Sequence, residues 1–214
     1  MQDAPALTID LADLDGAAAY KLLTSAVVPR PVAWVSTVDE QGRANLAPYS
    51  YFTIASASPP VLLFCPQLAA DEDAPGGVRM KDTLLNVEAT GEAVVHVASH
   101  AMAEAMNATS ASWPRGTSEF EQAGITAVPS ERVRPPRVAE APLAFECRVE
   151  QVIRLGDGPG AGAVVLARVL LAHLAAGTHN GRYALLDGLD PVGRLGGPAY
   201  TRAADGHFVL DRPA

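Results

Sequence analysis

The sequence predicts a mainly β, barrel-like domain with a few short helices, spanning residues 1–214 as one unit. Short β-branched and aromatic runs alternate with turn residues, which is typical of antiparallel strands. A strict alternation of apolar and polar residues begins at Leu143, and no internal repeat or second domain is apparent. A chain of 214 residues can bury one substantial core, and barrels of this length are often a single domain.

A hairpin is the clearest element of the N-terminal part. We expect an arm through Leu14, a short helix over 15–24, and then a strand over 29–38, which reads PRPVAWVSTV. The polar stretch DEQG closes a hairpin with the following strand, RANLAPYSYF. Pro48 in this second strand has no N–H, so it predicts an edge strand or a bulge, with nearby backbone N–H groups left free for a ligand.

The middle of the chain is predicted to alternate strands with short helices. A buried strand is expected over 61–65, followed by a polar loop and a helix that Asp82 caps and that ends before Gly91. Three apolar residues of this helix would face the core: Leu84, Leu85 and Val87. The next elements are a strand over 93–98, a helical segment over 100–108 and a short helix over 118–123.

The C-terminal half is predicted to be extended. After the proline-rich segment 125–142, a strand begins at Leu143 and places its charged residues on one wet face. These residues are Glu146, Arg148 and Glu150. The turn GDGPGAG leads to a strand over 163–173 with apolar residues on both faces, so we expect it to be better buried. The turn-rich remainder is expected to fold back over the core.

Charge and composition exclude several classes of partner. A formal charge of −8 argues against nucleic acid and anionic membranes, which normally require a basic face. No apolar run approaches the roughly 20 residues needed to cross a bilayer, and the N-terminus lacks a signal-peptide pattern. Cys65 and Cys147 lie in separate apolar runs and are interpreted as buried thiols. We therefore expect a soluble protein of the reducing cytoplasm.

Most motifs that suggest side-chain chemistry have a simpler structural interpretation. His96 and His100 are four residues apart but straddle a predicted strand-to-helix boundary, so no metal is expected. GDGPGAG precedes a strand and not a helix, which favours a hairpin loop over a dinucleotide-binding turn. Without a GxSxG elbow, no catalytic side-chain nucleophile is expected. The basic run of Arg132, Arg134 and Arg137 is taken as a solvated loop, with anion steering or an interface as the alternative.

The sequence KDT, at the start of the predicted helix over 82–90, is the best candidate for a binding site. Lys81 offers a cation and Thr83 a hydroxyl group, while the first helical turn offers unpaired N–H groups and the positive end of the helix dipole. This combination suits a phosphate dianion. The alternative is a simple helix cap beside a surface lysine.

Five motifs occur in order between Tyr20 and Tyr200: PRPVAWVST, the N-x-A-P-Y-S-x-F of 45–52, KDT followed by Asn86, PPRVAEAP and PVGRLGGPAY. Together they resemble the flavin reductase-like family of FMN-binding split barrels. The resemblance implies a six-stranded Greek-key split barrel that binds FMN at a homodimer interface, and often reduction by NADH or NADPH.

The resemblance also assigns cofactor-binding residues. It implies that Lys81 and Thr83 hold the phosphate, with Arg79 as a further helper, and that Ser36 and Thr37 border the ribityl chain and the ring. The stretch implied to line the isoalloxazine, largely through backbone groups, comprises Asn45, Ser50, Tyr51 and Phe52. The long acidic loop DEDAPGGV before KDT departs from the shorter, more polar segment expected there.

Three functional hypotheses follow. In the first, the protein is an NAD(P)H-dependent flavin reductase in which bound FMN passes electrons to an acceptor: an oxygenase partner, free flavin, a quinone or a metal chelate. In the second, it is a non-enzymatic FMN-binding electron carrier or flavin store. In the third, the barrel has lost flavin and binds another planar ligand.

Overall fold

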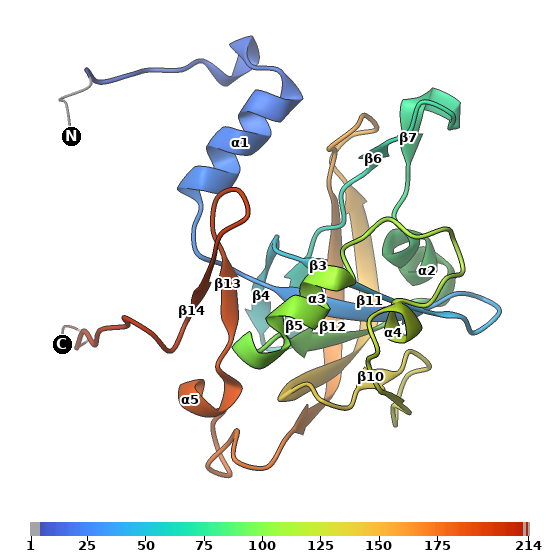
Figure 1. The fold of residues 1–214 in the computed structure, drawn as a ribbon, viewed down its shortest axis with the longest axis vertical. Helices are drawn as coiled ribbons and strands as arrows, with labels where there is room; N and C mark the ends of the chain where they lie inside the picture. The colour runs from blue at the N-terminus through green and yellow to red at the C-terminus, as the bar shows by residue number, and fades with distance from the viewer. Residues whose placement is uncertain (1–4, 212, 214) are drawn as a thin grey trace.

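The computed structural model describes residues 5–211 and 213 (Figure 1). Its main feature is a seven-stranded antiparallel sheet with the strand order β3-β2-β8-β11-β12-β5-β4. These strands are β2 (Ala33–Val38), β3 (Ala44–Tyr49), β4 (Phe52–Ala57), β5 (Pro60–Phe64), β8 (Glu92–Val97), β11 (Leu143–Arg154) and β12 (Ala163–Leu174). The expected mainly β class with short helices is confirmed.

Smaller elements surround this sheet. The helices are η1 (Leu11–Asp13), α1 (Gly16–Ala26), η2 (Pro75–Gly77), α2 (Asp82–Thr90), η3 (His100–Met102), α3 (Ala103–Ala108), α4 (Glu119–Gln122) and α5 (Leu186–Leu189). The remaining strands are β1 (Arg30–Pro31), β6 (Ala69–Ala70), β7 (Val78–Arg79), β9 (Ala127–Val128), β10 (Arg137–Val138), β13 (Val192–Arg194) and β14 (Tyr200–Arg202). No helix in the described part of the chain is long and apolar enough to cross a membrane.

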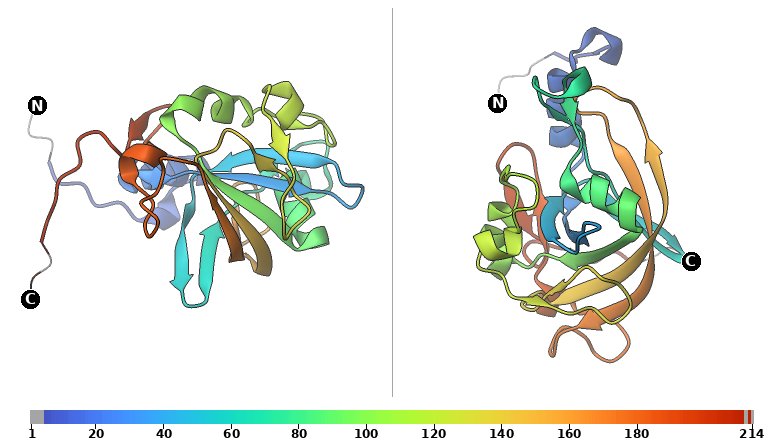
Figure 2. Two further views of the ribbon diagram at one scale, coloured as in Figure 1. Left: turned by 90° about the horizontal axis from the view of Figure 1, so that it is seen from below. Right: turned by 90° about the vertical axis from the view of Figure 1, so that its right-hand side faces the viewer.

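The sheet closes on itself between β3 and β4. These two strands form its opposite edges, yet only Ser50 and Tyr51 separate them in the chain. The ring of Tyr49 at the end of β3 lies 5.9 Å from the ring of Phe64 on β5, the neighbour of β4. One chain segment thus contributes to both edges, which gives the curled, split barrel seen from the side in Figure 2.

Strand β2 is buried on both faces because it separates two cores. Ala33 and Val35 pack inside the barrel with Leu84 and other apolar residues, whereas Trp34 packs on the opposite face with Met106 of α3. Side chains alternate along a strand, so both faces must be apolar to fill both cores. This arrangement explains the nearly continuous apolar run of the first hairpin strand. The predicted edge position of Pro48 in β3 is also confirmed.

Helix α2 covers one opening of the barrel. Leu84 and Val87 are almost fully buried, and Gly91 ends the helix in the left-handed conformation with φ of 69°. The prediction that Asp82 is the N-terminal cap was wrong by one residue. Lys81 occupies the cap position, with φ −66° and ψ 145°, and its side chain makes no capping hydrogen bond. The first turn therefore keeps N–H groups that no side chain of the described residues caps.

Helix α1 stands beside the barrel, next to the hairpin of β13 and β14 (Figure 1). It begins where expected, because the Asp15 carboxylate accepts a hydrogen bond from the N–H of Ala18 at 2.7 Å. Only Thr24 of this helix is buried. The guanidinium of Arg30 ties the helix to the body by donating to the carbonyls of Thr24, at 2.6 Å, and Val27, at 2.7 Å.

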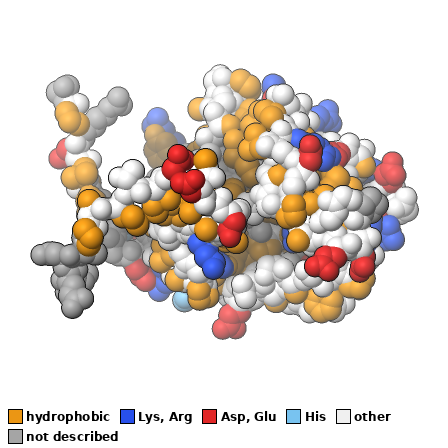
Figure 3. Space-filling model, turned by 90° about the horizontal axis from the view of Figure 1, so that it is seen from above, with side chains coloured by type: hydrophobic (Ala, Val, Ile, Leu, Met, Phe, Trp, Pro, Cys, Tyr) orange, Lys and Arg blue, Asp and Glu red, His pale blue; other side chains and the backbone are white. Residues whose placement is uncertain are grey.

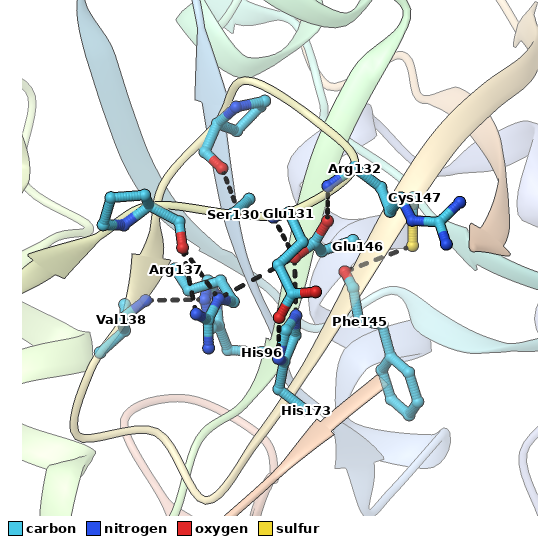
Figure 4. A network of polar contacts seen from close by, with 12 residues as sticks. His96, Ser130, Glu131, Arg132, Arg137, Val138, Phe145, Glu146, Cys147 and His173 are labelled. Atoms are coloured by element: carbon cyan, nitrogen blue, oxygen red, sulfur yellow. Dashed lines mark hydrogen bonds and ion pairs between the residues drawn. The ribbon is translucent and has the colours of Figure 1, made fainter. Parts of the chain in front are cut away.

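The expected wet face of β11 is wrong at Glu146, which is fully buried. Its carboxylate accepts hydrogen bonds from the backbone N–H groups of Glu131 and Arg132, at 2.9 and 2.6 Å, and lies 2.6 Å from Nε2 of His173 (Figure 4). These contacts hold the extended segment 125–142 over the sheet. Burial alone would raise the pKa of Glu146, but its hydrogen bonds outweigh burial and lower it.

Strand β12 is less buried than expected in its second half. Its first residues alternate between buried and half-buried positions, but Leu170 and Leu174 are 40% and 37% exposed. The register between β11 and β12 shifts beside Glu146 and again beside Val149, which marks bulges that a strict alternation does not anticipate.

Candidate functional site

Four of the predicted cofactor-binding residues line one pocket of about 200 Å³. Asn45 comes from β3, Arg79 from β7, and Lys81 and Thr83 from the start of α2. The segment 109–113, which follows α3 and includes Trp113, also lines the pocket. Residues separated by as many as 74 positions in the sequence, from Asn45 to Glu119, are thus brought together around the N-terminus of α2.

Thr83 is the best-defined donor in this pocket. Its side chain is almost entirely buried, and its hydroxyl oxygen accepts a hydrogen bond from the amide of Asn45 at 2.9 Å. A hydroxyl group can donate one hydrogen bond while it accepts others, so Thr83 can donate to a ligand or to the hydroxyl oxygen of Tyr49, with which it also has a hydrogen-bond contact. Asn45 therefore orients Thr83, an arrangement that the sequence motif alone did not reveal.

Two cations, Arg79 and Lys81, and two acids, Asp82 and Glu119, line the pocket. Arg79 lies 3.5 Å from the carboxylate of Asp71, and Arg115 lies 3.3 Å from that of Asp82. Lys81 makes no ion pair with any carboxylate of the described residues. The buried Glu119 accepts a hydrogen bond from the N–H of Leu46 at 2.8 Å, and burial raises its pKa. With the helix dipole of α2, Arg79 and Lys81 provide positive charge in a pocket whose two acids, Asp82 and Glu119, already have partners.

The other residues predicted to line the isoalloxazine ring lie along two adjacent clefts. Ser50 lines both a cleft of about 770 Å³ beside α1 and a more apolar cleft of about 510 Å³. Tyr51 and Phe52 line only the second of these clefts. The larger cleft meets the α2 pocket at Pro48 and Ser110, which line both. The segment 45–52 therefore connects all three spaces.

Ser36 and Thr37 are not brought into these spaces. Both side chains are fully buried in β2, and the hydroxyl oxygen of Thr37 accepts a hydrogen bond from the Asn86 amide at 3.0 Å. The Ser36 hydroxyl has no hydrogen-bond partner among the described residues. These two residues lie on β2, which is paired with β3 in the sheet. Their contact with a flavin remains a prediction.

Comparison with known proteins identifies the family. The family model of the flavin reductase like domain matches residues 25–187, most of the chain. The chain belongs to the flavin reductase-like family. It is 41% identical to a Deinococcus radiodurans protein, over 95% of this chain and 88% of the other. Family membership supports a flavin-related oxidoreductase.

Two solved structures share this split barrel over nearly their whole length. Nitrilotriacetate monooxygenase component B from Bacillus cereus is 35% identical and superposes with a TM-score of 0.88, covering 97% of this chain and 100% of that one. The 2-nitrobenzoate 2-nitroreductase NbaA from Pseudomonas fluorescens is 28% identical, with a TM-score of 0.84 and coverage of 97% and 96%.

Arg30 is a feature of this flavin reductase-like chain that the sequence interpretation missed. It is 7% exposed, and its Nε donates to the Ser50 hydroxyl at 3.4 Å while one terminal nitrogen donates to the carbonyl of Leu195 at 3.1 Å. Its position between two prolines in PRPVAWVST was the available signal, because a charged residue at the start of a buried strand needs partners.

His96 belongs to the core and not to a ligand site. Its Nδ1 donates to the carbonyl of Trp34 at 2.8 Å, and its Nε2 accepts from the N–H of Val138 at 2.9 Å, so both ring nitrogens are occupied. Burial lowers the pKa of His96 to about 4. The described residues contain no cluster of three or more potential metal ligands.

Proposed function

We propose that this protein binds FMN with its phosphate in the α2 pocket and acts as an NAD(P)H-dependent flavin reductase that passes electrons to an acceptor or partner protein. The observation that carries the proposal is the donor set of the α2 pocket. It comprises the oriented hydroxyl of Thr83, Lys81, which forms no ion pair among the described residues, and the first turn of a nine-residue helix, which has no side-chain cap.

The phosphate side of this proposal rests on complementary charge. A phosphate dianion accepts several hydrogen bonds, and donors at a helix N-terminus point at it without rearrangement. Lys81 adds a point charge, and Thr83 adds a fixed donor. Arg79 lies on the β6–β7 hairpin, which the acidic loop forms, and its contact with Asp71 keeps it at the pocket edge. The long acidic loop DEDAPGGV, which departs from the shorter segment expected before KDT, is folded into this hairpin.

The proposed binding site for the isoalloxazine ring is the free edge of β3. The N–H of Leu46 donates to Glu119 and not to the β2 ladder, so every second residue of β3 directs its backbone groups away from β2. Pro48 lies two residues after Leu46, so its carbonyl also faces away from β2. Because proline has no N–H, this position offers only the carbonyl. A flat ring can approach such an edge closely. The Ser50 hydroxyl, which accepts from Arg30, keeps a hydrogen to donate.

The chemistry that FMN supplies when bound is two-electron transfer, with hydride taken from a reduced nicotinamide and electrons passed to an acceptor. The chain's own residues bind the phosphate, orient the ring along β3 and exclude water. Donors beside Ser50 would stabilise negative charge that develops at the ring's polar edge. No side chain is required to act as a nucleophile or general base.

The proposed partners follow from the relatives and from exposed apolar surface. The 35%-identical neighbour is described as a component of a nitrilotriacetate monooxygenase, which favours a partner oxygenase as one acceptor. A homodimer is proposed because apolar side chains are exposed on two strands of the main sheet, β4 and β12, which β5 separates. They are Ile54 on β4, at 70% exposed, and Leu170 and Leu174 on β12.

An anaerobic reduction experiment tests the proposal. Protein loaded with FMN is mixed under argon with NADH or with NADPH, and the visible absorption of the flavin is followed. We expect the absorption to bleach with at least one nucleotide, at a rate well above that of free FMN. Bound flavin that stays oxidised with both nucleotides would refute the reductase and favour the electron carrier.

A further inference from the structure

We propose that the large cleft between α1, α3 and the β13–β14 hairpin binds the anionic nucleotide that donates electrons, with Lys21 and Arg194 holding its negative groups. This inference rests on the proposed function and extends it to the second ligand. Arg194 and Tyr200 lie in the motif PVGRLGGPAY, to which the family resemblance assigned no ligand, so the assignment comes from the charge and shape of the cleft.

The charge of the cleft contrasts with that of the whole chain. The sequence carries a net charge of −8, yet the residues lining this cleft of about 770 Å³ include Lys21, Arg30 and Arg194 and no carboxylate. None of the three cations forms an ion pair with an acid among the described residues. Unneutralised cations in a concave site attract anions from solution.

Arg194 is held in place by groups that leave its charge unneutralised. Its guanidinium stacks on the ring of Tyr200 at 4.5 Å, contacts the hydroxyl of the same residue, and donates to the carbonyl of Gly197 at 2.6 Å. Stacking and neutral acceptors fix the side chain without removing its attraction for an anion. Lys21 of α1 is exposed and lines the same cleft.

Arg30 adds a buried positive charge at the base of the cleft. Four of its five N–H groups donate to described neighbours, all of them uncharged oxygens. The charge is thus stabilised by dipoles alone and contributes to the positive potential of the cleft. Arg30 also links Ser50 to α1, so it positions the cleft wall relative to the flavin stretch.

The location of the cleft fits a ligand that exchanges electrons with the flavin. Pro48 and Ser50 of the proposed ring-binding segment line it, and Pro48 is shared with the α2 pocket. Figure 3 shows a hollow between the α1 side of the molecule and the barrel body. Tyr20 and Tyr200 supply aromatic surface, and the volume suits a dinucleotide, whose diphosphate would meet Lys21 and Arg194.

The test compares charge variants by steady-state kinetics and flavin binding. Arg194→Ala and Lys21→Glu are measured beside the matched control Arg182→Ala, because Arg182 also stacks on a tyrosine, at 5.0 Å, but lines none of the three spaces. Because Lys21 is exposed, we expect Lys21→Glu to fold normally and to remain informative if Arg194→Ala misfolds. The KM for NADH and for NADPH, the Kd for FMN and the Kd for benzoate are determined for each protein.

We expect the KM for the preferred nucleotide to rise about tenfold or more in both cleft variants, with the Kd for FMN and the control unchanged within twofold. Normal flavin binding with an unchanged nucleotide KM in both variants would overturn the inference alone. Unchanged nucleotide KM with weakened binding of benzoate, an anionic aromatic probe, would also overturn it and assign the cleft to an acceptor. A wild-type protein that binds no flavin would instead refute the proposed function.

Discussion

Replacing Thr83 with valine isolates the hydrogen bond on which the phosphate site depends. Valine keeps the shape of threonine but removes the hydroxyl group, so the donor to the ligand and the acceptor for Asn45 are both lost. A hydrogen bond to a charged group contributes about 1.5–3 kcal/mol. The Kd for FMN should therefore rise by roughly 10- to 150-fold.

The same substitution should also lower stability. The Asn45 amide would lose its partner in a buried position, where an unsatisfied group costs about 1–3 kcal/mol. Flavin fluorescence quenching measures the Kd, and urea denaturation without flavin measures the free energy of unfolding. Thr83→Ser is the matched control, since serine retains the hydroxyl group and should bind FMN nearly as the wild type does. A Kd in Thr83→Val within twofold of the wild-type value would refute the assignment of Thr83.

Further predictions concern charge, pH and packing. Lys81→Ala should raise the Kd for FMN in low salt, and the difference from wild type should shrink as KCl is added, because screening weakens the lysine's attraction; equal salt dependence would exclude that role. Burial lowers the folded-state pKa of His96 to about 4, below its ordinary value of 6.5. The stability contributed by the buried neutral imidazole is therefore fully present above pH 6.5 and is lost as pH falls toward 4. Stability from urea titrations should fall by about 2 kcal/mol between pH 7 and 5, and His96→Gln should lack this component; an identical pH dependence would contradict the buried neutral imidazole. Leu84→Ala should destabilise the protein by about 2–5 kcal/mol, because the fully buried side chain leaves a cavity; calorimetry showing no loss would contradict the packing of α2.

Local signals were sufficient for much of the fold. DEQG marked the hairpin of β2 and β3, and Pro48 marked an edge strand, because turn chemistry and a missing N–H act within a few residues. Asp15 and Gly91 likewise marked helix ends correctly. Glu146 could not be placed, because its burial depends on N–H groups from the distant segment that crosses β11.

The candidate site was predicted only in part for the same reason. Lys81 and Thr83 were recognisable from a local motif at a helix start. The contact of Asn45 with Thr83, however, joins positions 38 residues apart. Arg194, which forms no ion pair within the described part of the chain, belongs to a cleft that only the folded chain assembles. For Ser36, the resemblance implies a place beside the flavin and the structure buries its side chain fully in β2, so its contact with a flavin remains a prediction.

The most direct test of the central claim is the absorption spectrum of the purified protein after it has been mixed with equal amounts of FMN and FAD and freed of unbound flavin. Chromatography of the released cofactor then distinguishes FMN from FAD. We predict a yellow protein with an oxidised-flavin spectrum, about one FMN per chain, and loss of this flavin in the Lys81→Ala, Thr83→Val double variant. A colourless protein, or a double variant that retains FMN as tightly as the wild type, would contradict the claim that the α2 pocket binds the cofactor.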